Sequence, residues 1–177
     1  MYRDNSLVPS EAIRLCALGL LARQPAGYAE IAGAVRHFSG RIVGPSLDLL
    51  APSLELLKVE GLLELEGTGD DAIVRLTESG RREFHRLMTA RVRGPLGDVN
   101  KLILALKLRF LHLLDQETQL AQLDLLSESV ESELVRLTDL RRHHAEEPGY
   151  LVAWLDHEIG QLESRREWLA GLADKLA

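Results

Sequence analysis

The chain has 177 residues, of which 46% are hydrophobic, 27% charged and 5% aromatic, and its formal net charge is −6. This composition is typical of a globular protein and excludes a disordered or collagen-like chain. The single cysteine excludes an internal disulfide framework and a cysteine-based zinc knuckle, and fits a reducing compartment. No apolar run reaches the roughly 20 residues that a membrane span needs, and residues 1–6 lack the layout of a secretory signal. We therefore expect a cytoplasmic protein that does not bind membranes.

Charge and helix-breaking residues divide the chain near residue 93. The segment Arg93-Gly94-Pro95-Leu96-Gly97 carries two glycines and a proline, which is typical of a linker. Residues 1–93 contain 12 basic and 12 acidic side chains, whereas residues 94–177 contain 9 basic and 15 acidic ones. The excess of negative charge therefore lies in the second part, and we predict two domains, 1–93 and 94–177.

The first domain begins with three predicted helices. Apolar residues at helical spacing predict helices over residues 11–23 and 28–38, the second of them ended by Ser39-Gly40. A third helix is expected after Ser46, which can cap it. Pro52 is expected near the beginning of this helix, because a proline in a helix interior costs roughly 3 kcal/mol.

A β-hairpin and a fourth helix complete the first domain. Residues 62–66 and 72–76 alternate apolar and polar side chains on either side of a turn rich in glycine and aspartate, which predicts two antiparallel strands. Thr77 is expected to cap a helix that ends near residue 91.

The second domain is predicted to be nearly all helix, over residues 98–114, 117–144 and 150–177. Apolar residues seven apart in the last two helices are typical of coiled-coil packing. Two antiparallel helices of roughly 40 Å leave apolar surface that a second copy of the chain could cover. We therefore predict a homodimer whose interface contains Leu102, Phe110, Leu123, Val130, Leu137, Trp154, Leu155, Leu162, Trp168 and Leu169.

The predicted fold is mainly α: an N-terminal winged helix, made of three helices and a β-hairpin wing, followed by an α-helical antiparallel dimerisation arm. In winged-helix proteins the third helix enters the major groove of DNA, and the hairpin lies over the backbone or the minor groove. Two such heads on a symmetric arm would bind half-sites roughly 34–36 Å apart. This plan predicts a protein that binds double-stranded DNA.

Several ordered segments between residues 12 and 90 resemble the PadR family of bacterial transcriptional regulators. The two long helices that follow are similar to those of the larger, virulence-activator type of PadR protein. The resemblance implies a winged-helix homodimer that regulates transcription, most often as a repressor; we expect its operator to be pseudo-palindromic. The segments that carry it are Leu18-Gly19-Leu20-Leu21, Gly27-Tyr28-Ala29-Glu30-Ile31, Pro45-Ser46, Leu50-Ala51-Pro52-Ser53-Leu54, Glu60-Gly61-Leu62 and Arg75-Leu76-Thr77-Glu78-Ser79-Gly80-Arg81.

Seven side chains on the expected DNA side can donate hydrogen bonds to phosphate or bases: Tyr28, Arg36, Arg41, Ser46, Ser53, Lys58 and Arg75. Several have a structural alternative. Tyr28 could instead pack between the first two helices, and Ser46 could serve only as a helix cap. Lys58 could only offset the helix dipole, and Arg75 could pair with Glu64 across the hairpin.

Acidic residues on the same side favour an alternative function. The third helix carries Asp48 and Glu55, the hairpin turn carries Asp71, and Ala51 occupies a position where the PadR pattern has tyrosine. Carboxylates oppose phosphate contacts, which supply most of the affinity for DNA. The alternative is a winged-helix-like dimer with little DNA affinity that acts through a protein partner.

Other candidate sites are weaker. Trp154 and Trp168 are two heptads apart and either pack in the arm interface or hold a small aromatic effector. Neighbouring residues His143 and His144 point in different directions on a helix, so they predict no metal site. Cys16 is expected to be inert packing. The sequence contains no nucleotide-binding loop and no zinc-protease motif, so we expect neither an enzyme nor a cofactor.

Overall fold

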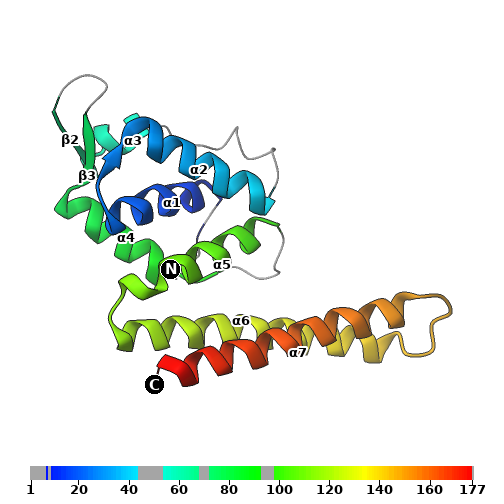
Figure 1. The fold of residues 1–177 in the computed structure, drawn as a ribbon. Helices are drawn as coiled ribbons and strands as arrows, with labels where there is room; N and C mark the ends of the chain where they lie inside the picture. The colour runs from blue at the N-terminus through cyan, green and yellow to red at the C-terminus, as the bar shows by residue number, and fades with distance from the viewer. Residues whose placement is uncertain (1–6, 8, 44–53, 68–71, 93–97, 177) are drawn as a thin grey trace, which may run out of the picture. The chain divides into compact units, whose positions relative to one another are not determined.

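The computed structural model describes residues 7, 9–43, 54–67, 72–92 and 98–176. The chain divides into two compact units, Met1–Leu114 and Asp115–Ala177, which we call unit 1 and unit 2. Unit 1 contains α1 (Pro9–Arg23), β1 (Ala26–Gly27), α2 (Tyr28–Val43), α3 (Leu54–Val59), β2 (Leu63–Glu66), β3 (Ile73–Leu76), α4 (Glu78–Thr89), α5 (Asp98–Phe110) and the short 3-10 helix η3 (Leu111–Leu113). Unit 2 contains α6 (Gln116–His143) and α7 (Leu151–Leu176) (Figure 1).

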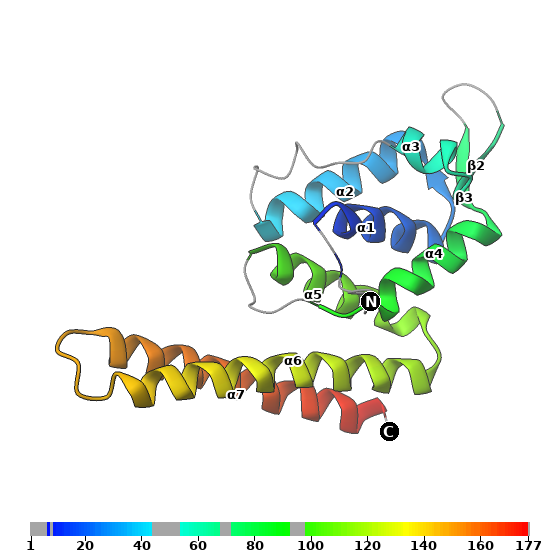
Figure 2. The same cartoon turned by 180° about the vertical axis from the view of Figure 1, so that it is seen from behind.

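Helix α1 is the centre of unit 1, with α2 on one side and α4 and α5 on the other (Figures 1 and 2). Its residues Ala12, Leu15 and Leu18 have no exposed surface. The ring of Phe110, from α5, lies directly against Gly19, where a Cβ atom would be only 2.4 Å from the ring. A glycine is therefore required for α5 to approach α1 this closely.

The three strands of unit 1 form an antiparallel sheet in the order β1-β3-β2. The hairpin β2–β3, which we call the wing, pairs Leu63 with Leu76 and Leu65 with Val74. These four side chains share one face of the sheet, because side chains alternate between faces along a strand. The two-residue strand β1 pairs with β3 on the other side, and so fixes where α2 begins.

The junction between the wing and α4 is built by hydrogen bonds around Thr77. Its hydroxyl donates to the Gly61 carbonyl at 2.7 Å and accepts from the Gly80 N–H at 3.0 Å, so Thr77 caps α4 as predicted. The Leu62 carbonyl accepts from the Thr77 N–H and lies 2.1 Å from where a Cβ atom on Gly80 would be. Gly80 thus allows α4 to pass directly over the backbone that leads into β2.

Unit 2 is an antiparallel hairpin of two long helices (Figure 1). Asp115 caps α6 by accepting from the Thr118 N–H at 2.9 Å. Near the turn, Arg141 donates to Asp156, and this hydrogen bond and ion pair lower the pKa of the Asp156 carboxyl. The heptad residues of both helices are buried between them: Leu123, Val130, Leu137, Leu155, Leu162 and Leu169.

The predicted mainly helical fold, a winged helix followed by a helical hairpin, is confirmed. Strand β1 was not predicted, and α2 is longer than the predicted helix over residues 28–38. The helix continues from Phe38 to Val43 because the Ser39 hydroxyl is buried and donates to the Val35 carbonyl one turn back, so Ser39 does not break the helix. The expected cap Ser46, the expected start at Pro52 and the expected linker 93–97 lie outside the described residues.

The division into compact units differs from the domain boundary expected at residues 93 and 94. Unit 1 extends to Leu114 because α5 packs against α1 and α2. Leu102, Ile103 and Leu106 of α5 consequently have no exposed surface. The boundary at 93 remains a prediction about function, whereas the packing assigns α5 to the first unit.

Candidate nucleic-acid interface

Helix α3 buries one side and exposes the other. Leu54 and Leu57 face the core of unit 1, with 7% and 0% of their surface exposed. The outward side chains are Glu55, Leu56, Lys58 and Val59. Val59 is 83% exposed. The helix thus presents an exposed surface of one acid, one base and two apolar side chains.

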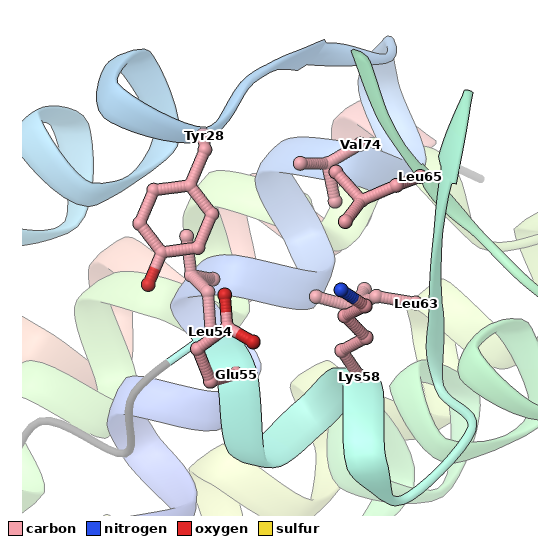
Figure 3. A pocket seen from close by; sticks show the side chains of 7 residues that line it. All are labelled: Tyr28, Leu54, Glu55, Lys58, Leu63, Leu65 and Val74. Carbon is pink, nitrogen blue, oxygen red and sulfur yellow. The ribbon is translucent and has the colours of Figure 1, made fainter. Parts of the chain in front are cut away.

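A small hollow lies between α3, the start of α2 and the wing (Figure 3). Tyr28, Glu55 and Lys58 stand around it, and Leu63, Leu65 and Val74 line it from the wing. Its volume of about 10 Å³ is room for about one water molecule. The hollow is too small for a ligand, but it brings two of the predicted DNA contacts, Tyr28 and Lys58, to one place.

The opposite face of the wing is charged. Arg75 is directly across from Glu64, yet its side chain makes an ion pair with Glu66, the diagonal neighbour on the same face. The alternative pairing of Arg75 with Glu64 is therefore not the one formed, because the diagonal neighbour Glu66 is within reach of the long arginine side chain. Arg75 faces away from the hollow because it alternates with Val74 along β3.

The remaining predicted DNA contacts are spread along α2 or lie outside the described residues. Arg36 and Arg41 are exposed. They lie roughly 12 and 20 Å along the helix axis from Tyr28, at 1.5 Å per residue. Ser46 and Ser53 are outside the described residues. The structure therefore groups Tyr28 with Lys58, and it does not bring Arg36, Arg41 or Arg75 to the same place.

Two cations of α5, the buried Lys107 and the partly buried Arg109, were not among the predicted site residues. The Lys107 ammonium, only 2% exposed, donates to the Met88 carbonyl in the last turn of α4, and burial lowers the pKa of Lys107 to about 8. The Arg109 guanidinium lies 4.3 Å from the centre of the Phe38 ring. Lys107 lies four residues after Ile103 and three before Phe110, so helical spacing places it on the buried face of α5, and this spacing is the sequence signal that could have identified it.

Cys16 is buried on α1, as expected for packing. Burial raises the pKa of its thiol to about 11, although the charge of Arg109 opposes this shift. The thiolate is the reactive form of cysteine, so this shift makes the side chain unreactive near neutral pH.

Two arginines of α4 are close to acidic side chains within unit 1. Arg86 pairs with Glu83 and with Glu11 of α1, and these hydrogen bonds raise its pKa. Arg82 lies 4.0 Å from Glu78. Arg86 and Arg82 are therefore paired within the unit rather than grouped with Tyr28 and Lys58.

The ten residues predicted at the dimer interface fall into two groups. Eight are already buried within a single chain: Leu102 and Phe110 in unit 1, and Leu123, Val130, Leu137, Leu155, Leu162 and Leu169 in unit 2. Trp154 and Trp168 are 52% and 53% exposed. The prediction that these residues meet a second chain therefore rests on the two tryptophans.

The two tryptophans are 14 residues apart on α7, which is roughly 21 Å along the helix axis. One small aromatic molecule cannot contact both within a single chain. Among the described residues, no three His, Cys, Asp or Glu side chains are grouped so that they could hold a metal ion. None of the helices in the described part of the chain is both long and apolar enough to span a membrane.

A family model described as "Putative AphA-like transcriptional regulator" matches residues 2–173, which is nearly the whole chain. The chain belongs to this family. The match confirms the resemblance to PadR-type regulators, because AphA-like proteins are regulators of that type. The chain is therefore a member of a family of transcriptional regulators. No protein of curated function matches the chain.

Solved structures of PadR-like regulators are similar to the chain over nearly its full length. The PadR-like regulator BC1756 from Bacillus cereus is 20% identical, with a TM-score of 0.40, over 93% of this chain and 97% of that chain. Bacillus subtilis PadR in complex with operator DNA is 18% identical, with a TM-score of 0.39, over 93% and 98%. Bacillus subtilis PadR in complex with p-coumaric acid is 17% identical, with a TM-score of 0.39, over 97% and 98%.

Proposed function

We propose that the chain is a homodimeric repressor that binds a pseudo-palindromic operator through α3 and the wing of unit 1. The observation that carries this proposal is the exposed outer face of α3 beside Tyr28 and the wing, in a chain whose family consists of transcriptional regulators. A third helix in this position enters the major groove in winged-helix proteins. The protein would act in the cytoplasm without catalysis, and its effect would come from occupying DNA.

The charges around α3 define what DNA binding requires. Lys58 and the hydroxyl of Tyr28 can donate to phosphate or bases, whereas Glu55 repels phosphate. On the wing, Arg75 must exchange its contact with Glu66 for one with phosphate. Each head therefore has few cations, and we expect modest affinity per head and a dependence on dimerisation to place two heads on one duplex.

The experiment is a titration of genomic DNA fragments at about 50 and 200 mM salt. Contacts between cations and phosphate make the binding constant fall steeply between these salt concentrations. Arg41→Ala, which removes an exposed cation predicted to contact phosphate, should weaken binding and reduce the salt slope by about 1. Arg166→Ala, an exposed cation on α7, is the matched control and should change neither quantity. Absence of binding at 50 mM salt would refute the proposal.

The acidic face of the wing favours a second candidate function. Glu64 and Glu66 flank Arg75, so this face carries more negative than positive charge. Such a surface fits a basic region of a protein partner better than it fits DNA. This candidate predicts no DNA binding at low salt and a protein complex that Glu64→Lys disrupts.

Exposed apolar side chains on unit 2 support the homodimer. After the heptad residues are buried within one hairpin, Val135 remains 72% exposed and Trp154 and Trp168 about half exposed. Tryptophan is enriched where proteins associate. A small aromatic effector remains an expectation, and the distance between the two tryptophans requires that only one of them contacts it within a chain.

A further inference from the structure

The outer face of α3 carries three side chains whose chemistry the fold does not use. Glu55, Lys58 and Val59 are at positions i, i+3 and i+4, so they lie on one face of the helix. All three are exposed. Within the described residues, neither the Glu55 carboxylate nor the Lys58 ammonium has a hydrogen bond or an ion pair. The stability of unit 1 therefore does not explain the acid and the base at these positions.

A carboxylate is a poor choice for a surface that only holds the DNA backbone, because it repels phosphate. It has a use in the major groove, where the exocyclic amino group of cytosine is a hydrogen-bond donor. An ionised carboxylate only accepts hydrogen bonds, so it is mismatched to guanine, whose N7 and O6 are acceptors. It also suits adenine less well, because the adenine amino group is next to the acceptor N7.

Lys58 has the complementary chemistry. Its ammonium donates hydrogen bonds, and the N7 and O6 atoms of guanine accept them. One C·G pair therefore offers a partner to each side chain, and residues one helical turn apart have Cβ atoms about 5–6 Å from one another. Val59, beside them, has the apolar surface that suits the methyl group of a neighbouring thymine.

We propose that Glu55 and Lys58 read a single C·G base pair in each half-site of the operator. Glu55 accepts from the cytosine amino group, Lys58 donates to N7 and O6 of the paired guanine, and Val59 contacts the methyl group of an adjacent thymine. This inference rests on the proposed function. It makes Glu55 a residue that lowers affinity for DNA in general and raises the preference for one sequence.

The first test selects bound duplexes from a randomised DNA pool with the full-length protein and three variants. Wild type should enrich one C·G pair at a fixed position in each half-site. Glu55→Gln, which keeps an acceptor oxygen, should retain more of this preference than Glu55→Met, which has none and leaves only the guanine contact of Lys58. Glu131→Gln, an exposed acid on α6 with the same charge change as Glu55→Gln, is the control and should select the wild-type sequence.

The second test measures affinity for the selected duplex and for a duplex with T·A in place of the C·G pair. Wild type should prefer the selected duplex about tenfold, the low end of what one base contact provides. Glu55→Met should discriminate between the two duplexes less than wild type does, because only the guanine contact of Lys58 remains. It should also bind the T·A duplex more tightly than wild type does, because a charge that repels phosphate has been removed. A merely structural role of Glu55 would not move this ratio.

The contribution of the cytosine amino group is tested by replacing that base with 2-pyrimidinone, which lacks it. Wild type should lose about tenfold in affinity, and Glu55→Met should lose much less, so the variant controls for the weaker base pair. An unchanged consensus in the Glu55→Met selection, or equal losses for both proteins, would overturn the inference while DNA binding itself stands. If no sequence is enriched by wild type, the proposed function fails and the inference fails with it.

Discussion

Units 1 and 2 use their apolar residues in opposite ways. In unit 1, helices α2, α4 and α5 pack around α1, and even the ammonium of Lys107 is buried. In unit 2, one stripe of apolar residues is buried between two helices, and Trp154, Trp168 and Val135 remain exposed. The core of unit 1 is enclosed on several sides, whereas the hairpin of unit 2 leaves these apolar side chains on its surface. Heptad spacing thus identified residues that pack within the chain, and we expect the exposed residues that it leaves out to contact a second chain.

The largest expected effects come from substitutions that distinguish the buried heptad residues of unit 2 from its exposed tryptophans. Leu162→Asp places a charge between α6 and α7, where Leu162 is 7% exposed, and should destabilise the hairpin by about 4 kcal/mol. Trp154→Glu with Trp168→Glu should leave the helical content of the monomer intact and produce monomers in sedimentation at micromolar concentration. Circular dichroism and sedimentation separate the two outcomes.

The opposite results for the two variants would contradict this division of unit 2 into residues that pack within the chain and residues that contact a second chain. A dimer that persists in the double tryptophan variant would mean that other residues hold the two chains together. A Leu162→Asp variant that keeps its full helical content but becomes monomeric would mean that the heptad stripe lies between chains after all.

The same glycine substitution should have opposite effects in the two units. In Gly80→Ala the new methyl group would lie 2.1 Å from the Leu62 carbonyl, and because that atom is backbone, the variant should lose about 3 kcal/mol. Gly160→Ala on α7 meets nothing within 4 Å and should gain up to about 1 kcal/mol from helix propensity. Urea unfolding measures both. Equal stability of Gly80→Ala and wild type would show that α4 and the wing are not in close contact.

The elements were predictable from sequence wherever local periodicity determines them. The wing, the Thr77 cap and the two helices of unit 2 follow from alternation, from capping chemistry and from sevenfold spacing. The end of α2 was not predictable, because a serine and a glycine are ordinary turn residues. In the fold, Ser39 is buried and its hydroxyl donates to the Val35 carbonyl, and the helix continues through both residues. The strand β1 was missed because two residues carry no periodicity.

The candidate site was predictable in its residue types more than in its geometry. Lys58, Tyr28 and Glu55 were recognised from their place on the expected third helix and at the start of the second. Tyr28 lies near Lys58 because of the way α3 packs beside the wing. The ion pair of Arg75 with Glu66 rather than Glu64 likewise depends on how the side chains are arranged on the wing. Local sequence patterns do not specify which side chains of different elements come into contact on the folded surface, so only the structure could identify these contacts.

The buried ammonium of Lys107 should make the stability of unit 1 depend on pH. The pKa is about 8 in the fold and 10.5 for a free lysine, so between these values the unfolded chain binds more protons. The free energy of unfolding should therefore rise with pH across this window, by up to about 3 kcal/mol from this group, and fall as pH decreases towards 8. Lys107→Met should remove this rise. Urea unfolding at pH 7.5, 9 and 10.5 compares the two proteins.

The difference between the Lys107→Met and wild-type curves isolates this residue, because other lysines and tyrosines that titrate above pH 9 are common to both. The variant also loses the hydrogen bond to the Met88 carbonyl. This loss is independent of pH and shifts its curve without changing its slope. Parallel curves for the two proteins would show that the ammonium stays hydrated, and that the core of unit 1 is less complete than its contacts suggest.

The smallest expected effect is a change in the alkylation rate of Cys16, which measures how often solvent reaches the core of unit 1. A thiol with a pKa of about 11 is almost wholly protonated at pH 8, and it is also shielded from solvent. Alkylation in native buffer should therefore occur only when unit 1 opens, and its rate should increase in Gly80→Ala and stay unchanged in the double tryptophan variant of unit 2. If the wild type is labelled rapidly, at a rate that these substitutions do not change, solvent reaches Cys16 at the centre of unit 1. The two units would then differ less in how completely they bury their apolar residues than the exposed fractions suggest.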